Sequence, residues 1–397
     1  MISGVDTKTD ILIVGGGIIG CSTAYFLAAN GLGDRVVVIE QDPSYARATT
    51  PQGAGGVRRM FSVRENILMS TFSLDFYSRF SRTMAVDGEM PDISLNRQGY
   101  LFVVGKQGAS QLEENYTLQK RLGVNVMLMD TSALGQRFPS IGRKDVALSC
   151  YSPDDGWVDP YASLMGFRKK ASSLGVRFFK DRVTGFDVSR RIIRAARTES
   201  GRTLLAERFV NASGPWAGEV SSMAGMKIPV VPMCRLQHYW QCAQECEALP
   251  LVKDENGLFF RPEGDGFVGG RPSWEITHGF IDDITRGYCA DYFERVVWPL
   301  LEVRVPGFQA LKVMRTWAGH YAQNLFDGNM ILGSWTGGAE NFFVACGFSG
   351  HGIMHAPAVG QALTELLVFD RFETMDLMRF SYDRIIFNKP IREQGII

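Results

Sequence analysis

DILIVGGGIIG, residues 10–20, places a short apolar run directly before a cluster of glycines. The apolar run at 11–14 predicts a buried β-strand, and the glycines from 15 to 20 predict a tight turn. A helix is expected over 18–29, because Asn-Gly at 30–31 is a typical helix stop. With a second strand expected over 35–40, these elements make one βαβ unit, which favours an α/β fold.

Gly15, Gly17 and Gly20 have the spacing G-x-G-x-x-G. Gly15 permits a tight turn, Gly17 has no Cβ and lets a diphosphate approach the backbone, and Gly20 allows close packing of helix on strand. The helix N-terminus adds N–H donors and a positive dipole end. Glu40 ends the second strand 20 residues after Gly20, where a carboxylate accepts both ribose hydroxyls and repels a 2′-phosphate. The unit therefore predicts a dinucleotide site and argues against NADP, but it does not separate FAD from NAD.

The composition limits the classes of function. Lys+Arg and Asp+Glu both total 42 among 397 residues, and this balance argues against a broad nucleic-acid-binding surface. The seven cysteines are odd in number and loosely spaced, which is typical of a reducing compartment. The first residues lack the pattern of a signal peptide, and no run reaches the roughly 20 apolar residues of a membrane-spanning helix. We expect a cytoplasmic protein, and its oligomeric state is left open.

No metal site is expected. Cys242 and Cys246 are separated by three residues, but no second ligand pair follows at the spacing of a zinc site. His351 and His355 are four residues apart, but they lack the glutamate of H-E-x-x-H and an evident third ligand.

Two later segments also combine small residues with a turn. VNASGPW at 210–216 reads as a strand end where the chain can pass close to a flat ring system, and ACGFSGHG at 345–352 precedes a helix expected over 352–367. Backbone N–H groups of the second turn can face the O2/N1 edge of a flavin. An NAD-dependent dehydrogenase does not need these segments, so they favour FAD. Other helices are expected at 62–82, 161–174 and 291–303, and other strands at 97–104, 176–180, 183–188, 330–333 and 342–345.

These segments give the chain a family resemblance. It resembles the D-amino-acid-oxidase superfamily, in the sarcosine oxidase and glycine oxidase branch, and within it iminodiacetate oxidase and related N-substituted-glycine oxidases. The matching pieces occur in family order over nearly the whole chain. They are DILIVGGGIIG, GGVRRMFSVRENILMS, DDGWVDP, VNASGPWAG, LFFRPEG, RTWAGHYAQNLFDGNMILG and GFSGHGIMHAPAVG.

The resemblance implies where FAD binds. The residues implied at its diphosphate and ribose are Gly15, Gly17, Ile18, Ile19, Gly20, Glu40 and Gln41. Those implied near the adenine and the adjoining strand end are Val183, Ala212, Ser213, Gly214 and Trp216. The isoalloxazine ring is expected between two segments, the loop with Thr49, Thr50, Gly55, Gly56 and Val57 and the turn with Gly347, Gly350, His351, Gly352, Ile353 and Met354.

The chain also departs from the family pattern. Several members attach FAD through a cysteine where this chain has Gly319, so non-covalent FAD is expected. Sarcosine oxidases hold the substrate carboxylate with a lysine where this chain has Met354, and a second lysine of that branch is replaced within 267–269. The two missing lysines argue against sarcosine itself as the substrate and leave the FAD assignment unchanged.

Three arginines are candidates for binding a substrate carboxylate. Arg261, in LFFRPEG, is the first choice, because a planar guanidinium suits bidentate binding. The alternative for Arg261 is an ordinary surface arginine at a strand end. Of Arg58 and Arg59, one is expected to bind the carboxylate or support the flavin, and the other to face solvent. Several arginines together suggest an anionic substrate, and two carboxylates, as in iminodiacetate, would explain more than one of them.

Candidate ring side chains come from two further segments. Arg235 opens a strand expected to face the flavin, in which alternation puts His238 and Trp240 on one face. The same alternation puts Tyr239 on the other face. One of these three rings can wall the pocket, and burial alone is an alternative explanation. His351 is expected near the flavin in a positional or electrostatic role rather than as a general base. Tyr321 can donate to the substrate or pack in the core.

The expected activity is FAD-dependent oxidation of a C–N bond in a small secondary amine or amino acid, such as an N-substituted glycine, with oxygen as acceptor. One alternative is a dehydrogenase that passes electrons to a protein or quinone, and another is a non-catalytic FAD-binding assembly factor. The expected fold is a Rossmann-type FAD-binding domain of residues 1–86, 146–224 and 325–397. A substrate domain of 87–145 and 225–324 is expected to be an antiparallel sheet with helices.

Overall fold

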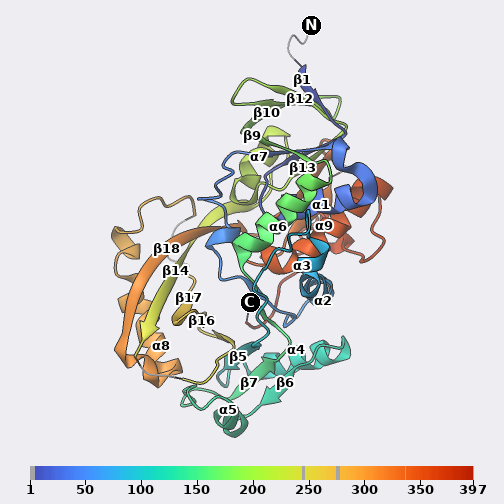
Figure 1. The fold of residues 1–397 in the computed structure, drawn as a ribbon. Coiled ribbons are helices and arrows are strands. Elements are labelled where there is room, and N and C mark those ends of the chain that lie inside the picture. Colours follow the sequence, from blue (N-terminus) through green and yellow to red (C-terminus); the bar gives the residue numbers. More distant parts are fainter. Residues whose placement is uncertain (1–4, 244–245, 274–277, 336, 397) are drawn as a thin grey trace.

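The computed structural model describes residues 5–243, 246–273, 278–335 and 337–396. It contains two large sheets, one near the N-terminus and one that includes the long strands β14 and β18 (Figure 1). The expected α/β architecture, a Rossmann-type domain with a second and mainly antiparallel domain, is confirmed. In the described part of the chain, no helix has both the length and the apolarity needed to cross a membrane.

The first sheet has six strands in the order β19-β20-β13-β2-β3-β9. Its pairs are parallel except for β19 with β20. The strands are β2 (Ile11–Val14), β3 (Val36–Glu40), β9 (Arg177–Lys180), β13 (Arg208–Asn211), β19 (Ile331–Ser334) and β20 (Phe342–Cys346). All four residues of β2 are buried, as expected for a parallel strand that is covered on both faces.

Alternation along β2 assigns its side chains to two cores. Ile11 and Ile13 pack with the helices on one face of the sheet, while Leu12 and Val14 pack in the core on the other face. The helices of the first face are α1 (Ile18–Leu27), α2 (Arg64–Ser78), α6 (Pro160–Ser173) and α9 (Gly352–Phe369). The second face is covered by α7 (Ala217–Met223) and by the sheet of β1 (Val5–Lys8), β10 (Val183–Ser189), β11 (Ile192–Thr198) and β12 (Thr203–Leu205).

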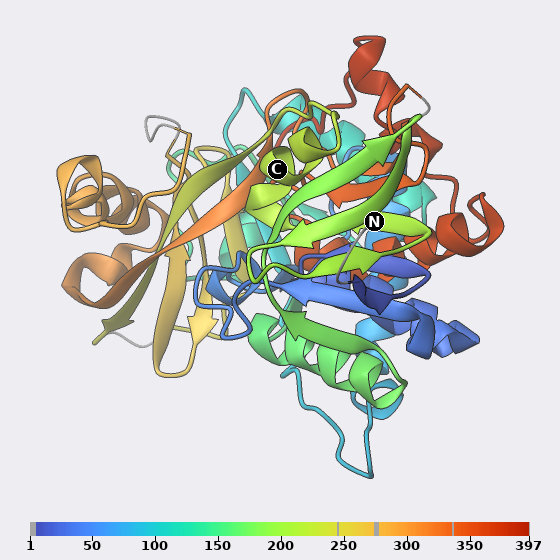
Figure 2. The same ribbon diagram turned by 90° about the horizontal axis from the view of Figure 1, so that it is seen from above.

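The second large sheet has eight strands in the order β18-β14-β17-β16-β15-β5-β7-β6. Its members are β5 (Tyr100–Val104), β6 (Met127–Met129), β7 (Leu148–Ser152), β14 (Val230–Cys242), β15 (Leu251–Asp254), β16 (Phe259–Glu263), β17 (Gly266–Gly270) and β18 (Leu311–Asn324). Figure 2 shows β14 and β18 running together from this sheet toward the N-terminal domain. Because β7 pairs with β5 and β6, this sheet takes in residues beyond the division predicted near residue 146.

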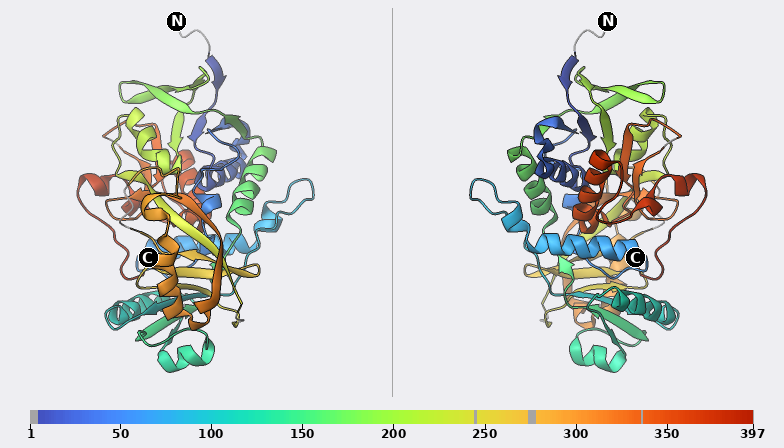
Figure 3. Two further views of the ribbon diagram at one scale, coloured as in Figure 1. Left: turned by 90° about the vertical axis from the view of Figure 1, so that its left-hand side faces the viewer. Right: turned by 90° about the vertical axis from the view of Figure 1, so that its right-hand side faces the viewer.

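Shorter helices cover the outer side of the eight-stranded sheet. There α8 (Trp298–Arg304) and α5 (Thr131–Arg137) contribute to a core around Trp240, Phe260 and Phe308. Helix α4 (Ala109–Arg121) and α5 lie at the end of the molecule opposite the N-terminus (Figure 3). The remaining short elements are α3 (Phe80–Thr83), α10 (Asp383–Ile386) and the paired strands β4 (Gly56–Val57) and β8 (Gly156–Trp157).

The C-terminal tail caps helix α2. The side chain of the N-cap residue Val63 cannot accept a hydrogen bond. Glu393 from the tail supplies the acceptor instead. Its carboxylate accepts the Ser62 N–H at 2.6 Å, the Val63 N–H at 3.2 Å and the Asn66 amide at 2.6 Å. A carboxylate at a helix N-terminus stabilises the helix through these bonds and through the dipole.

We expect Gly20→Ala to lower the free energy of unfolding by at least ~2 kcal/mol, since overpacking against backbone cannot be relieved by a change of rotamer. A Cβ at Gly20 would lie 1.9 Å from Gly15 O. Urea denaturation of the apoproteins measures the change. Gly17→Ala is the matched control, because a Cβ there meets nothing within 4 Å and φ is −68°. Equal stability of the two variants would contradict the packing assigned to Gly20.

Candidate functional site

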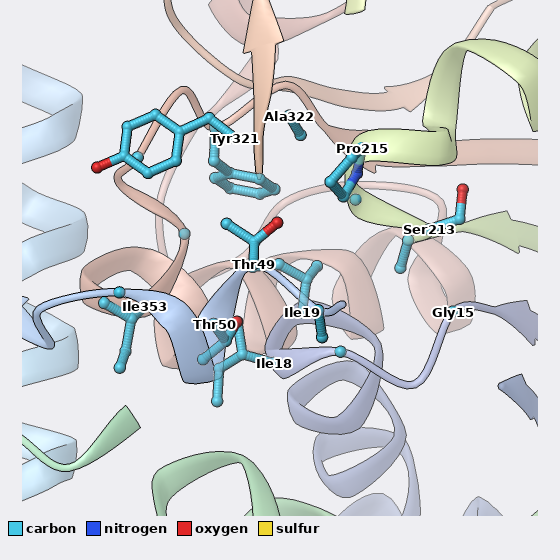
Figure 4. Close-up of a pocket in the computed structure, with 18 of the residues that line it drawn as sticks. Gly15, Ile18, Ile19, Thr49, Thr50, Ser213, Pro215, Tyr321, Ala322 and Ile353 are labelled. Carbon is cyan, nitrogen blue, oxygen red and sulfur yellow. The ribbon is translucent and has the colours of Figure 1, made fainter. Parts of the chain in front are cut away.

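A large cavity lies between the two domains. Its volume is about 1240 Å³, which exceeds the roughly 1,000 Å³ upper range of pockets for drug-sized ligands. All three glycine-bearing segments, around residues 15–19, 212–216 and 348–354, line it. Figure 4 shows Tyr321 and Ala322 on one side of this space and Ile18 and Ile19 on the other. Its size and its lining fit a dinucleotide with room for a small substrate.

The end of β2 and the start of α1 have the geometry of a diphosphate site. Gly15 has φ +102°, and a Cβ there would meet Ala212 O at 2.5 Å, so only glycine fits the turn. At Gly17, the N-cap residue of α1, nothing lies within 4 Å of an added Cβ, and the residue borders the cavity. The first turn of α1 has no acidic residue, which leaves its N–H groups and dipole available to an anion.

Glu40 lines the cavity beside the glycine turn. Its Oε2 accepts the Gly16 N–H at 2.7 Å and its Oε1 accepts the Asp42 N–H at 2.8 Å. Burial raises the pKa of the carboxyl above its usual value, and the two N–H donors oppose this shift. Each carboxylate oxygen has a further lone pair that can accept a ribose hydroxyl.

Most residues predicted to bind the cofactor line this cavity. They are Gly15, Gly17, Ile18, Ile19, Glu40, Gln41, Thr49, Thr50, Gly55, Gly56, Val183, Ala212, Ser213, Gly214, Trp216, Gly350, His351, Gly352, Ile353 and Met354. The structure places Gly20, Val57 and Gly347 behind the lining. Gly20 packs against Gly15, Val57 is buried in the helical core, and Gly347, with φ +73°, allows the chain to pass close to Val230 and Asn324.

One face of the eight-stranded sheet forms the opposite wall, and we call it the cavity face. Alternation along β14 puts Arg235 and Gln237 on the cavity face and Leu236 and Trp240 in the outer core. Tyr100 of β5, Leu251 and Lys253 of β15, Phe259 of β16 and Tyr321 of β18 complete the cavity face. The sequence reasoning missed Lys253 and Tyr100. The signal for Lys253 was a lysine inside the short strand LVKD, whose other three residues are buried.

Arg58 and Arg59 have different surroundings. Arg58 is only 2% exposed and lines the cavity, with its guanidinium 4.1 Å from the Phe61 ring centre and bonded to the Met60 carbonyl. Arg59 turns away to Asp155, which accepts its backbone N–H at 2.9 Å and its Nε–H at 2.7 Å. Arg59 therefore pairs with a buried carboxylate rather than facing solvent, and Arg58 is the arginine of this segment that a substrate can reach.

His351 and Tyr321 are both at the cavity. Arg58 Nη2 lies 3.5 Å from His351 Nε2, and burial, together with the charge of Arg58, lowers the pKa of His351 well below its usual value. A neutral imidazole follows at physiological pH. Tyr321 lies under the Arg235 guanidinium, which is 5.4 Å from the ring centre. Burial raises the pKa of the Tyr321 phenol, so the hydroxyl remains a donor.

Two expected site residues lie elsewhere. Arg261 donates its Nε–H to Ala54 O at 2.7 Å and an Nη1–H to Pro262 O at 2.8 Å, and it also pairs with Glu263. The guanidinium is thus used to hold the Ala54 loop and does not line the cavity. His238 is on the outer face of β14, 3.0 Å from the Thr316 hydroxyl and packed on Phe293, where burial lowers its pKa to about 4. Of the candidate arginines for a carboxylate, Arg58 and Arg235 therefore line the cavity and Arg261 does not.

Among the residues that the structure describes, no group of three or more His, Cys, Asp and Glu is placed to hold a metal ion. All seven cysteines are free thiols, and none of them is among the described residues that line the cavity. Gly319, which the resemblance aligns with the cysteine that links FAD in several family members, lies on β18. A Cβ added at Gly319 would lie 3.0 Å from Gln52 Cβ.

Gly17→Ala is expected to weaken dinucleotide affinity at least ~10-fold, or about 1.4 kcal/mol, because its methyl group would occupy the space through which a diphosphate reaches the backbone. Flavin fluorescence quenching during titration of the apoprotein measures the affinity. Wild-type affinity in this variant would place the diphosphate elsewhere.

Comparison with known proteins agrees with this geometry. A family model described as "FAD dependent oxidoreductase" (DAO) matches residues 10–366. The chain is 36% identical to "FAD-dependent oxidoreductase domain-containing protein 1" of Xenopus laevis, over 98% of this chain and 85% of that protein. The L-proline dehydrogenase structure from P. horikoshii superposes with a TM-score of 0.86 at 26% identity, covering 97% of this chain and 100% of the other. Iminodiacetate oxidase from Chelativorans sp. BNC1 has the same fold, with a TM-score of 0.76 at 20% identity over 94% of this chain and 98% of that one.

The family match covers the βαβ unit, the middle strand end and the glycine-rich turn before α9, which are the segments that meet at the cavity. The glycines of these segments and Glu40 fit FAD, the dinucleotide that the family binds. The chain belongs to the DAO family of FAD-dependent oxidoreductases.

Proposed function

We propose that this protein oxidises the C–N bond of a small anionic secondary amine or amino acid, such as an N-substituted glycine, to an imine that water hydrolyses. The observation that carries the proposal is a set of basic side chains that line the cavity close to one another, Arg58, Arg235 and Lys253. We call this set the cationic end. Bound FAD would supply the two-electron oxidation, and the residues of the chain would bind and orient the substrate.

The cationic end is suited to a carboxylate. Arg58 and Arg235 are both held by backbone carbonyls, Arg58 by Met60 O and Arg235 by Cys234 O at 3.1 Å and Ser273 O at 3.3 Å. These bonds fix the orientation of two guanidinium groups at the cavity lining, and the planar guanidinium suits the geometry of a carboxylate. Two cationic side chains can hold one carboxylate between them or bind two carboxylates of a dicarboxylic amine.

The electron acceptor distinguishes two versions of the proposal. Oxygen is our first choice. A dehydrogenase that passes electrons to a protein or quinone is supported by the likeness to a structure named L-proline dehydrogenase, whose name also specifies a secondary amine as substrate. Stopped-flow reoxidation of the reduced protein with air separates the versions, because an oxidase reoxidises at its turnover rate and a dehydrogenase does not.

Anaerobic titration with a panel of amines tests the proposal itself. We expect N-substituted glycines and proline to bleach the visible flavin absorbance, and the same amines without the carboxylate to do so at least ~100-fold less efficiently, since removing one partner of a buried charged pair costs about 2–5 kcal/mol. Bleaching by neutral amines alone would contradict the anionic substrate. A flavin that no amine bleaches would favour a non-catalytic FAD-binding assembly factor.

A separate experiment tests whether FAD is bound without a covalent link. We expect acid precipitation to release all flavin into the supernatant, because no cysteine thiol lines the described cavity. Absorbance of the supernatant and of the redissolved pellet gives the two fractions. Yellow colour that stays with the denatured protein would contradict non-covalent binding.

A further inference from the structure

The turn that follows Arg58 holds its guanidinium at the cavity. Arg58 donates to the Met60 carbonyl, and its guanidinium lies 4.1 Å from the centre of the Phe61 ring. The Phe61 N–H closes the turn on the Arg59 carbonyl at 3.0 Å. The orientation of the Arg58 side chain therefore depends on where Met60 and Phe61 lie.

The two residues after this turn are bound by Glu393, in the C-terminal tail. Its carboxylate accepts the Ser62 N–H at 2.6 Å, the Ser62 hydroxyl at 2.5 Å and the Val63 N–H at 3.2 Å. Glu393 is only 8% exposed, and these donors together with the Asn66 amide satisfy a charge that is costly to bury without partners. The bonds fix the chain directly after Phe61.

The tail is itself anchored on the loop that follows β18. The Ile391 N–H donates to the Asp327 carboxylate at 3.0 Å, and the Asn329 amide donates to the Ile391 carbonyl at 2.7 Å. Asp327, whose side chain is fully buried, pairs with Arg384 at 2.8 Å. The tail therefore connects the loop after β18, the strand of Tyr321, to the segment that carries Arg58.

Further contacts keep the Phe61 turn in the fold without the tail. The Gln119 amide donates to the Phe61 carbonyl at 3.0 Å, and the His351 ring lies edge-on to the Phe61 ring with 5.2 Å between the ring centres. Loss of the Glu393 bonds would consequently let the turn shift, whereas Gln119 and His351 would still keep it at the domain boundary.

We propose that Glu393 is a positioning residue of the substrate site. Through Ser62 and Val63 it fixes the turn that orients Arg58 toward the substrate carboxylate. This inference rests on the proposed function, in which Arg58 binds that carboxylate. Glu393 does not line the cavity, so it acts on the affinity for an anion only through the Arg58 turn.

Glu393→Gln tests the inference, because an amide has one acceptor oxygen where the carboxylate has two, and its NH₂ group would meet donors. The probe is isobutyrate, a carboxylate without an amine, titrated into the holoprotein in a calorimeter. We expect the variant to bind isobutyrate at least ~10-fold more weakly than wild type, or about 1.4 kcal/mol. Flavin reduction by an amine that lacks a carboxylate is expected to be unchanged.

Arg58→Met separates positioning from a general loss of stability. We expect Arg58→Met alone to weaken isobutyrate binding at least ~10-fold. When Glu393→Gln is added to it, no further loss is expected, because the group that Glu393 positions is already absent. Non-additivity of this kind is the signature of two residues that act through one interaction.

Glu365→Gln is the matched control. Glu365 is a buried carboxylate on α9 that accepts the Glu373 N–H at 2.7 Å and the Thr374 N–H at 3.1 Å. Its bonds lie within α9 and the segment that follows, so the variant is expected to unfold at lower urea concentration and to bind isobutyrate like wild type.

Ser62→Ala keeps the test open if Glu393→Gln does not fold. It removes the hydroxyl that donates to Glu393 and leaves the backbone N–H donors in place. We expect isobutyrate binding about 3-fold weaker than in wild type, the effect of one hydrogen bond, and again no added loss beside Arg58→Met.

The results that overturn the inference are distinct from those that overturn the proposed function. Wild-type affinity for isobutyrate in Glu393→Gln or in Arg58→Met, an equal loss in Glu365→Gln, or a full further loss in the Arg58→Met background would each overturn the inference. If N-substituted glycines still reduce the wild-type flavin in that case, the proposed function stands. If wild type binds no isobutyrate and no amino acid reduces its flavin, both fail together.

Discussion

The contact between α1 and β2 is the constraint on which the rest of the structure depends. Gly20 has no room for a side chain against Gly15 O, so the helix begins directly at the end of the strand. This closeness points the N–H groups at the start of α1 into the cavity, and it places the Glu40 carboxylate, bonded to the Gly16 N–H, on the same side. A wider turn would separate the two halves of the dinucleotide site.

The second domain adds charge selection to this site. The cavity face contributes Arg235 and Lys253, and the first domain contributes Arg58 from the loop that follows Thr49 and Thr50. The start of α1 and the cationic end line one cavity, so in the proposed function separate sets of donors would bind the diphosphate and the substrate: backbone N–H groups at α1 and side-chain cations on the other side. Burial of the cations makes their interaction with a carboxylate stronger than at a surface.

Local patterns in the sequence predicted the first domain well. The run at 11–14, the glycine turn and Glu40 predicted the βαβ unit, because steric rules act over neighbouring residues. The polar helix α4 (Ala109–Arg121) and the short α5 were missed, since each buries few residues and those of α4 are mostly polar. The sequence could not separate Arg261 from Arg235, because both are strand arginines with the same guanidinium group, and only the tertiary structure shows that Arg261 donates to Ala54 O. Lys253 was missed because only the tertiary structure brings it to the cavity that Arg58 and Arg235 also line.

A crystal structure of the purified holoprotein with isobutyrate tests the account most directly. We predict FAD with its diphosphate at Gly15–Gly17 and its flavin beneath the cavity face, and the carboxylate in contact with Arg235 and Arg58. Absence of FAD from this cavity, or a carboxylate bound away from both arginines, would contradict the account.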